Sequence, residues 1–203
     1  YMKETYLNKK GLTVKNLVTI GIFSALFLIF SLVGGVFFAI NPILTFYMPI
    51  GCALLCGPIY CLMVAKVQKR WAITILGIIM CIVYFVTGMH WALAVGYLVM
   101  GIIADIVAGL GKYKDIKINL LSYMFLSLGA TGSYIVFFIN PTKWMTAMLA
   151  KGTEQTYLDT MQANAHSWML AVIIIGTLVM AFISGLIGQK MLRKQFEKAG
   201  IVQ

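Results

Sequence analysis

The chain has 203 residues, of which 61% are apolar and only 11% are charged. Soluble domains contain about 45–50% apolar residues, and the mean hydropathy of +0.92 means more apolar surface than a soluble fold of this size can bury. A soluble domain is therefore excluded, as are a disordered chain and, with 4 Cys, a secreted disulfide scaffold. We expect an all-α integral membrane protein, with one transmembrane domain over residues 1–203.

Six stretches are close to the length needed to cross about 30 Å of hydrocarbon. In chain order they are Leu17–Ile40, Ile43–Ala65, Trp71–Thr87, Trp91–Gly109, Ile118–Ile139 and Trp168–Gly188. Each is longer than a transmembrane strand and none alternates polar with apolar residues, so we expect six helices.

One connection, Asn140–Ser167, is much longer than the others. Its apolar side chains recur at helical spacing at 144, 145, 148 and 149 and again at 157, 158 and 161, with Gly152 between the two groups. This pattern predicts two short amphipathic helices on the outer side of the membrane. They can rest on the lipid surface or close a pocket as a lid, and the length of the segment favours the lid.

The net charge of +10 is concentrated at the ends of the predicted spans. The N-terminus, the second and fourth connections and the C-terminus hold 14 of the 16 Lys and Arg residues: Lys3, Lys9, Lys10, Lys15, Lys66, Lys69, Arg70, Lys112, Lys114, Lys117, Lys190, Arg193, Lys194 and Lys198. Only Lys143 and Lys151 lie on the other side. The positive-inside rule therefore predicts a cell-membrane protein with both termini in the cytoplasm. Boundary charges of this kind argue against nucleic acid as a partner.

A catalytic constellation is absent from the sequence pattern. There is no HExxH or GxSxG motif, and the four Cys lie within spans, where we expect them to pack rather than bind metal. Asp105 is a carboxylate inside a span, which makes it a functional candidate, and Lys112 shares its helix face. We favour a structural anchor or a partner contact for Asp105. We expect no enzyme activity and no metal site.

The outer ends of the spans carry aromatic and histidine side chains. His90 and Tyr97 are seven residues apart and share a helix face, and Tyr134 lies near the outer end of the fifth span. With the lid, these helix ends could enclose an apolar cavity with a few polar groups, which is typical of a small-molecule site. At the other end of the chain, Gly21 and Ala25 form a small-xxx-small face that lets another helix approach closely.

These features together resemble the substrate-binding S components of energy-coupling factor (ECF) transporters. The stretches that carry the resemblance are Lys15–Ala25, Gly96–Asp105 and the Asn-Pro-Thr turn at Asn140, within six spans and about 200 residues. The chain is most similar to the Trep_Strep-type S components, over nearly its whole length. The resemblance implies an S-component-like bundle whose outer loops and outer helix ends bind a vitamin-like micronutrient.

The same resemblance implies partners and site residues. The S component associates with a transmembrane T component and two ATPase subunits, and it topples in the membrane to release the substrate inside. Its Ala-xxx-Ala contact face corresponds here to Gly21 and Ala25. The implied substrate-binding residues are Asn41, Met89, His90, Trp91, Tyr97, Tyr134, Asn140, Trp144, Tyr157, His166 and Trp168. No intrinsic cofactor is implied, and haem or a vitamin is a candidate substrate.

Two other functions remain open. An intramembrane enzyme would require a reactive Asp105 or His90, so that alanine replacement abolishes turnover. A solitary facilitator would carry flux in liposomes without any partner.

Overall fold

The computed structural model describes residues 11–198, with side chains described as far as Arg193. The predicted cytoplasmic charges Lys3, Lys9 and Lys10, and the side chains of Lys194 and Lys198, lie outside this part. Over residues 11–198 all regular structure is helical, which confirms the predicted class. The elements are α1 (Val14–Ala39), η1 (Leu44–Tyr47), α2 (Met48–Val67), α3 (Ala72–Val86), α4 (Trp91–Leu110), α5 (Ile116–Ser127), η2 (Leu128–Thr131), α6 (Gly132–Ile139), α7 (Pro141–Leu149), α8 (Gln155–Ala163) and α9 (Trp168–Lys198).

Five helical segments of the described chain are long and apolar enough to cross a membrane. They are Val14–Ala39, Leu44–Val67, Trp91–Leu110, Ile116–Ile139 and Trp168–Arg193, and they match five of the six predicted spans. The remaining one, α3, has 15 residues and is therefore about 22 Å long. It is shorter than predicted because Trp71 takes a left-handed conformation (φ 75°) before it and Gly88 (φ 79°) follows its end.

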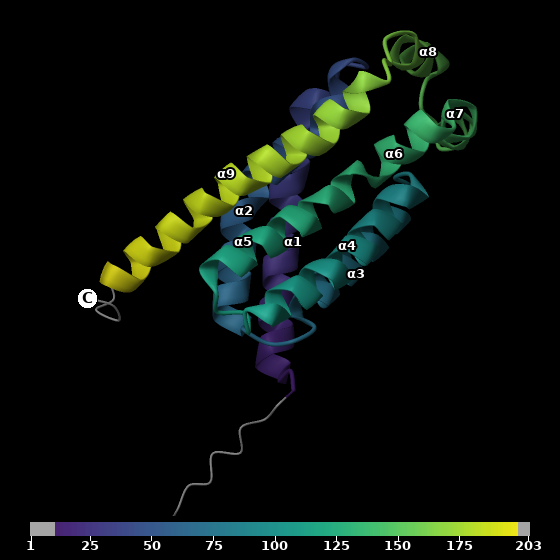
Figure 1. Ribbon diagram of the computed structural model, residues 1–203. Coiled ribbons are helices and arrows are strands. Elements are labelled where there is room, and N and C mark those ends of the chain that lie inside the picture. Colours follow the sequence, from purple (N-terminus) through teal and green to yellow (C-terminus); the bar gives the residue numbers. More distant parts are fainter. Residues whose placement is uncertain (1–10, 199–203) are drawn as a thin grey trace, which may run out of the picture.

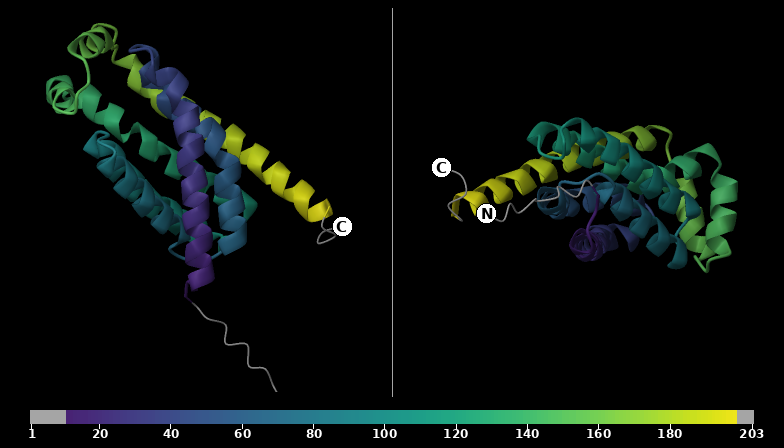
Figure 2. Two further views of the ribbon diagram at one scale, coloured as in Figure 1. Left: turned by 180° about the vertical axis from the view of Figure 1, so that it is seen from behind. Right: turned by 90° about the horizontal axis from the view of Figure 1, so that it is seen from below.

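The long helices form two packed groups (Figures 1 and 2). In one, α2 lies between α1 and α9; in the other, α4 lies between α3 and α5. The groups meet where α5 contacts α9 and α2, and where α3 contacts α1. Large apolar side chains remain exposed on all of the long helices, as expected of surfaces that face lipid.

A proline in the middle of α2 explains how α2 and α9 are joined. Pro58 has no N–H, so the carbonyl of Leu54 loses its helical partner. The hydroxyl of Ser184, on α9, donates to that carbonyl and accepts from the backbone N–H of Gly57 at 3.1 Å. Because polar groups without partners are costly in lipid, this pair ties α9 to the point where α2 is opened.

The predicted fifth span is not one continuous helix. It is divided into α5, the 3₁₀ turn η2 and α6, although together they have the length of a span. The change of geometry occurs where the backbone lies against α4: a Cβ on Gly96 would stand 2.5 Å from the carbonyl oxygen of Gly129, and a Cβ on Gly132 would meet the carbonyl of Ala92. Periodicity alone does not reveal such an approach, since it depends on two helices at once.

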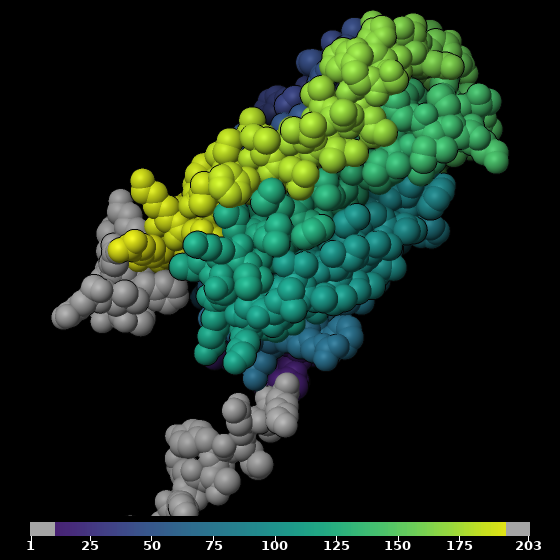
Figure 3. Space-filling view, viewed as in Figure 1, coloured from purple at the N-terminus to yellow at the C-terminus, as the bar shows by residue number. Residues whose placement is uncertain are grey.

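The long connection confirms the prediction of two short helices. They are α7 and α8, and Gly152 lies between them with φ 90°, a conformation that side chains other than Gly rarely adopt. Both helices lie at one end of the bundle, beside the end of α6 and the start of α9 (Figure 1). In the space-filling view of Figure 3, the lid helices α7 and α8 lie directly against the end of α6 and the start of α9.

Candidate functional site

A cavity of about 380 Å³ lies beneath α7 and α8. We call it the lid cavity. Its walls come from the end of α1, from η1 and the start of α2, from the α3–α4 connection, from α6, and from the lid helices. Its lining residues are Ala39, Thr45, Met48, Met89, His90, Leu93, Ala130, Ser133, Tyr134, Trp144, Met148, Thr153, Glu154, Tyr157, Leu158 and Met161. Mostly apolar walls with a few polar groups are typical of a small-molecule site.

The lid is attached to the bundle on three sides. The indole N–H of Trp144 donates to the Ser133 hydroxyl at 2.9 Å, and the Tyr157 hydroxyl donates to the carbonyl of Ala39 at 2.9 Å. The Lys151 ammonium donates to the carbonyl of Met89. The lid therefore reaches α6, the end of α1 and the α3–α4 connection, which are far apart in the sequence.

His90 is the most enclosed polar side chain of the cavity, with 3% of its surface exposed. Its Nδ1 accepts the backbone N–H of Ala92 at 3.2 Å and so caps the start of α4. Its ring lies 5.8 Å from the Trp144 ring, between centroids. Burial, together with the nearby Lys151 charge, lowers the pKa of His90, which keeps the imidazole neutral at pH 7. With Nδ1 accepting, the proton belongs on Nε2, which makes His90 a hydrogen-bond donor.

The role of His90 as a helix cap bears on haem as a substrate. An imidazole that ligates iron through Nε2 carries its proton on Nδ1. His90 would then lose the acceptor that caps α4. His90 is therefore better suited to donate a hydrogen bond to a substrate than to ligate iron. Over the described residues there is also no cluster of three or more His, Cys, Asp or Glu side chains that could hold a metal ion.

The lowered pKa of His90 predicts a loss of stability in mild acid. Below its ordinary value of 6.5, the unfolded chain binds a proton that the folded protein resists. The unfolding free energy therefore falls as the pH falls from 6.5 toward the lowered pKa, and this contribution is absent above that window. We expect the thermal midpoint of His90→Gln to depend less steeply on pH than that of the wild type between about pH 8 and about pH 5.

A second variant separates the two causes of this effect. Lys151→Gln removes the neighbouring positive charge but leaves the burial of His90, so it should reduce the acid sensitivity only in part. An unchanged pH dependence in His90→Gln would show that other groups produce the effect.

The structure brings together five of the eleven predicted site residues at the lid cavity: Met89, His90, Tyr134, Trp144 and Tyr157. A sixth, Tyr97, lines a neighbouring chamber deeper in the bundle. Tyr134 also fixes the fold, since its hydroxyl donates to the carbonyl of Thr45 at 2.5 Å.

The other five predicted residues do not line the lid cavity. Asn140 caps α7, and the side-chain oxygen of Asn41 accepts the backbone N–H groups of Ile43 and Leu44 in the turn that leads into η1. His166 and Trp168 stack on each other at 6.1 Å on the surface, and Trp91 is also exposed. Sequence position placed all five near the outer helix ends, but it could not tell which side of each end faces inward.

Several lining residues were not predicted. Met148, Leu158 and Met161 belong to the apolar faces of the lid helices, so their helical spacing was a usable signal. Thr45 and Ser133 had no such signal, because a small hydroxyl side chain in a mostly apolar stretch shows no helical spacing. They reach the cavity only because η1 and α6 are packed against each other.

The position of the Asp105 carboxylate inside a span is explained by its hydrogen bonds to the start of α3. Its carboxylate accepts the backbone N–H of Trp71 at 2.8 Å and the hydroxyl of Thr74 at 3.0 Å, both through Oδ2. Trp71 offers no side-chain cap of its own, and a helix N-terminus favours a negative charge. Lys112, which shares the helix face of Asp105, is not among the donors to this oxygen. Asp105 acts as a cap supplied by α4, which agrees with the structural anchor that we favoured.

We expect Asp105→Ala to destabilise the protein, because it leaves the buried Thr74 hydroxyl and the partly buried Trp71 N–H without this acceptor. Each costs about 1–3 kcal/mol. Asp105→Asn keeps an acceptor oxygen for both donors and should lose clearly less. The thermal midpoints of the two variants in detergent measure the difference. Equal midpoints for Asn and Ala would contradict the capping role.

No curated protein and no solved structure matches the chain. A family model does match, over residues 14–198, and its description is "Hypothetical bacterial integral membrane protein (Trep_Strep)". The match covers all of the described spans and both lid helices. The chain, a multi-pass membrane protein with a lidded cavity at one end of its bundle, therefore belongs to the Trep_Strep family of bacterial integral membrane proteins.

Proposed function

We propose that this protein is the substrate-binding subunit of an ECF-type importer and captures a small micronutrient at the outer face of the cell membrane. The observation that carries the proposal is the lid cavity, which is large enough for a small molecule and is partly covered by a segment that folds over it. Binding does not require ATP in this proposal. ATP is used by two ATPase subunits, which act through a transmembrane T component.

The orientation follows from the charges. The lid end carries Lys143 and Lys151, whereas the described connections at the other end carry Lys66, Lys69, Arg70, Lys112, Lys114 and Lys117. With α3 as a short sixth crossing, both termini lie on the basic side, which the positive-inside rule assigns to the cytoplasm. The lid cavity then faces outward, where a nutrient is captured.

The proposed contact with the T component is the free face of α1. Its buried residues, Ile20, Ser24, Phe27, Ser31, Gly34 and Gly35, form one stripe. Gly21 and Ala25 lie outside that stripe and are exposed, and a Cβ on Gly21 would meet no atom within 4 Å. A close helix–helix contact is therefore available there without any change in the bundle.

Native mass spectrometry of the protein, purified in detergent without ATP, tests the proposal. We expect a retained small molecule, or binding of one from a panel of vitamins and tetrapyrroles. Gly21→Leu combined with Ala25→Leu should abolish copurification with the T component and leave ligand binding intact. Val179→Trp, on an exposed face of α9 that lies outside the proposed contact, is the control for bulk alone.

Two results would contradict the proposal. If assembly survives the double leucine variant, the α1 contact is wrong. If the protein binds nothing and instead turns over a substrate, or carries flux in liposomes without partners, the enzyme or the facilitator takes its place.

A further inference from the structure

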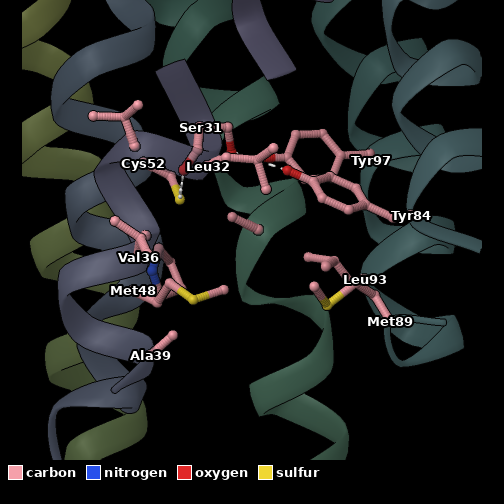
Figure 4. A pocket seen from close by; sticks show the side chains of 14 residues that line it. Ser31, Leu32, Val36, Ala39, Met48, Cys52, Tyr84, Met89, Leu93 and Tyr97 are labelled. Atoms are coloured by element: carbon pink, nitrogen blue, oxygen red, sulfur yellow. Dashed lines mark hydrogen bonds between the residues drawn. The ribbon is translucent and has the colours of Figure 1, made fainter. Parts of the chain in front are cut away.

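A second chamber, of about 410 Å³, continues inward from the lid cavity. The two spaces share the lining residues Ala39, Met48, Met89, Leu93 and Ala130. In Figure 4, Val36 and Met48 lie on one side of the chamber, Met89 and Leu93 lie on the other, and Tyr84 and Tyr97 lie near Ser31 at its inner end. Ala39 and Ser31 are eight residues apart on α1, so the chamber is about 12 Å deep.

The chamber offers a ligand almost no unsatisfied polar group. Ser31 and Tyr84 are hydrogen-bonded to each other through their hydroxyls at 2.9 Å, and the Cys52 thiol donates to the Ser31 carbonyl at 3.1 Å. Tyr97 also lines the chamber, and its hydroxyl interacts with Ser31 and Tyr84 at the inner end. The remaining lining side chains are apolar. Desolvating a polar group without a partner is costly, so the part of a molecule that enters here has to be apolar.

The neck between the two spaces is lined by two methionines. Met48 and Met89 are unbranched and flexible, and such side chains adapt to ligands of different shape. Gly35 helps to keep this region open, because a Cβ on it would stand 2.9 Å from the Met48 side chain. The chamber also reaches the surface of α1, where the lining residues Leu32, Val33 and Val36 are about half exposed.

The polar end of the site lies under the lid and is balanced in charge. Glu154 lines the cavity, and Lys151 lies at its edge, where it donates to the carbonyl of Met89. His90 is held neutral. The His90 N–H and the Ser133 hydroxyl are suited to hydrogen-bonding with a substrate. This combination favours an uncharged, hydrogen-bonding group over a carboxylate.

We propose that the substrate is an elongated amphipathic molecule, whose uncharged polar head lies under the lid while its hydrocarbon tail occupies the inner chamber. The inference rests on the proposed function, because it assumes that the lid cavity captures a substrate. It adds the chemical class: a molecule with a tail, and not a compact polar vitamin or a dicarboxylate such as haem.

The chamber can be filled without disturbing the core. Val36 is 50% exposed and lines the chamber but not the lid cavity. Val36→Trp therefore places a large side chain at the chamber wall and breaks no buried contact. Val18→Trp is the matched control, because Val18 lies on the same helix, is 57% exposed and lines neither space.

The experiment uses saturated 1-monoacylglycerols of increasing chain length as probes, with glycerol as the head alone. Binding is followed by the rise in thermal midpoint of the protein in nanodiscs. We expect affinity to rise with chain length in the wild type and in Val18→Trp. In Val36→Trp it should stop rising at a shorter chain, with a loss of at least tenfold for the longest probes.

Three outcomes decide against the proposal. Affinity that is independent of chain length, or identical in Val36→Trp and wild type, overturns the tail chamber; if a water-soluble vitamin still binds, the proposed function survives. If neither probes nor vitamins bind, the proposed function itself fails. A bilayer lipid that enters from the side would ignore the lid, so long-chain binding that survives Trp144→Ala also overturns the proposal.

Discussion

Trp144→Ala is expected to lose the molecule that we propose the lid cavity binds, whereas Trp168→Ala is expected to keep it. Trp144 is buried in the lid, with its indole N–H bonded to Ser133 and its ring edge-on to Phe137 at 5.2 Å. Removal of such an anchor opens the cavity wall and frees one side of the lid. Buried aromatic anchors contribute about 2–4 kcal/mol to binding, so affinity should fall by about 30- to 1,000-fold.

The two tryptophans are a matched pair, since both lie at the lid end of the bundle and, of the two, only Trp144 lines the cavity. Trp168 is 56% exposed. Trp144→Phe separates packing from hydrogen bonding, because it keeps a ring but loses the bond to Ser133, and we expect it to lie between wild type and alanine. Dissociation constants for the retained molecule, measured on correctly folded protein, decide the matter. Equal losses in Trp144→Ala and Trp168→Ala would show that the lid cavity is not the site.

Gly34→Leu should have the largest effect on stability. Gly34 faces Gly51 across the contact between α1 and α2, and a Cβ on Gly34 would stand 2.5 Å from the Gly51 carbonyl oxygen. The obstacle is backbone, which cannot rotate away, so the helices would have to separate over several residues. Overpacking of ordinary side chains already costs about 1–3 kcal/mol, and we expect more here.

Gly21→Leu is the control, because it makes the same change on the same helix where no atom lies within 4 Å. We expect Gly34→Leu to lose its thermal transition or its monodisperse peak in size-exclusion chromatography, and Gly21→Leu to retain both. If the two variants were equally stable, the α1–α2 contact would not be as close as described. Together they separate packing within the bundle from the proposed partner contact.

The fold class and the course of the chain could be read from the residues alone. In lipid, the backbone N–H and C=O groups of a long apolar run have to be hydrogen-bonded within the protein, and a helix achieves this within one segment. Five of the predicted spans follow from this rule, and α3 is the short exception. The two lid helices were also readable, since their apolar spacing and Gly152 are local signals.

The site could be predicted only in part. His90, Trp144 and Tyr157 were found because aromatic and imidazole groups at outer helix ends are unusual enough to notice. Asn41 and His166 looked equally suitable in the sequence, yet Asn41 closes the turn before η1 and His166 lies on the surface. The difference is the direction in which each helix end faces, and this is set by neighbours distant in the chain.

The division of α5 from α6, the role of Asp105 and the inner chamber could not be predicted from the residues alone. Each depends on two or more helices meeting at one point: Gly96 against Gly129, Asp105 against the start of α3, and Met48 opposite Met89. Periodicity along one helix reports which face is apolar, but lipid and protein neighbours are equally apolar, so it does not tell one from the other. Close contacts at glycines and shared hydrogen bonds determine which apolar faces meet another helix, and these contacts exist only once the helices have packed.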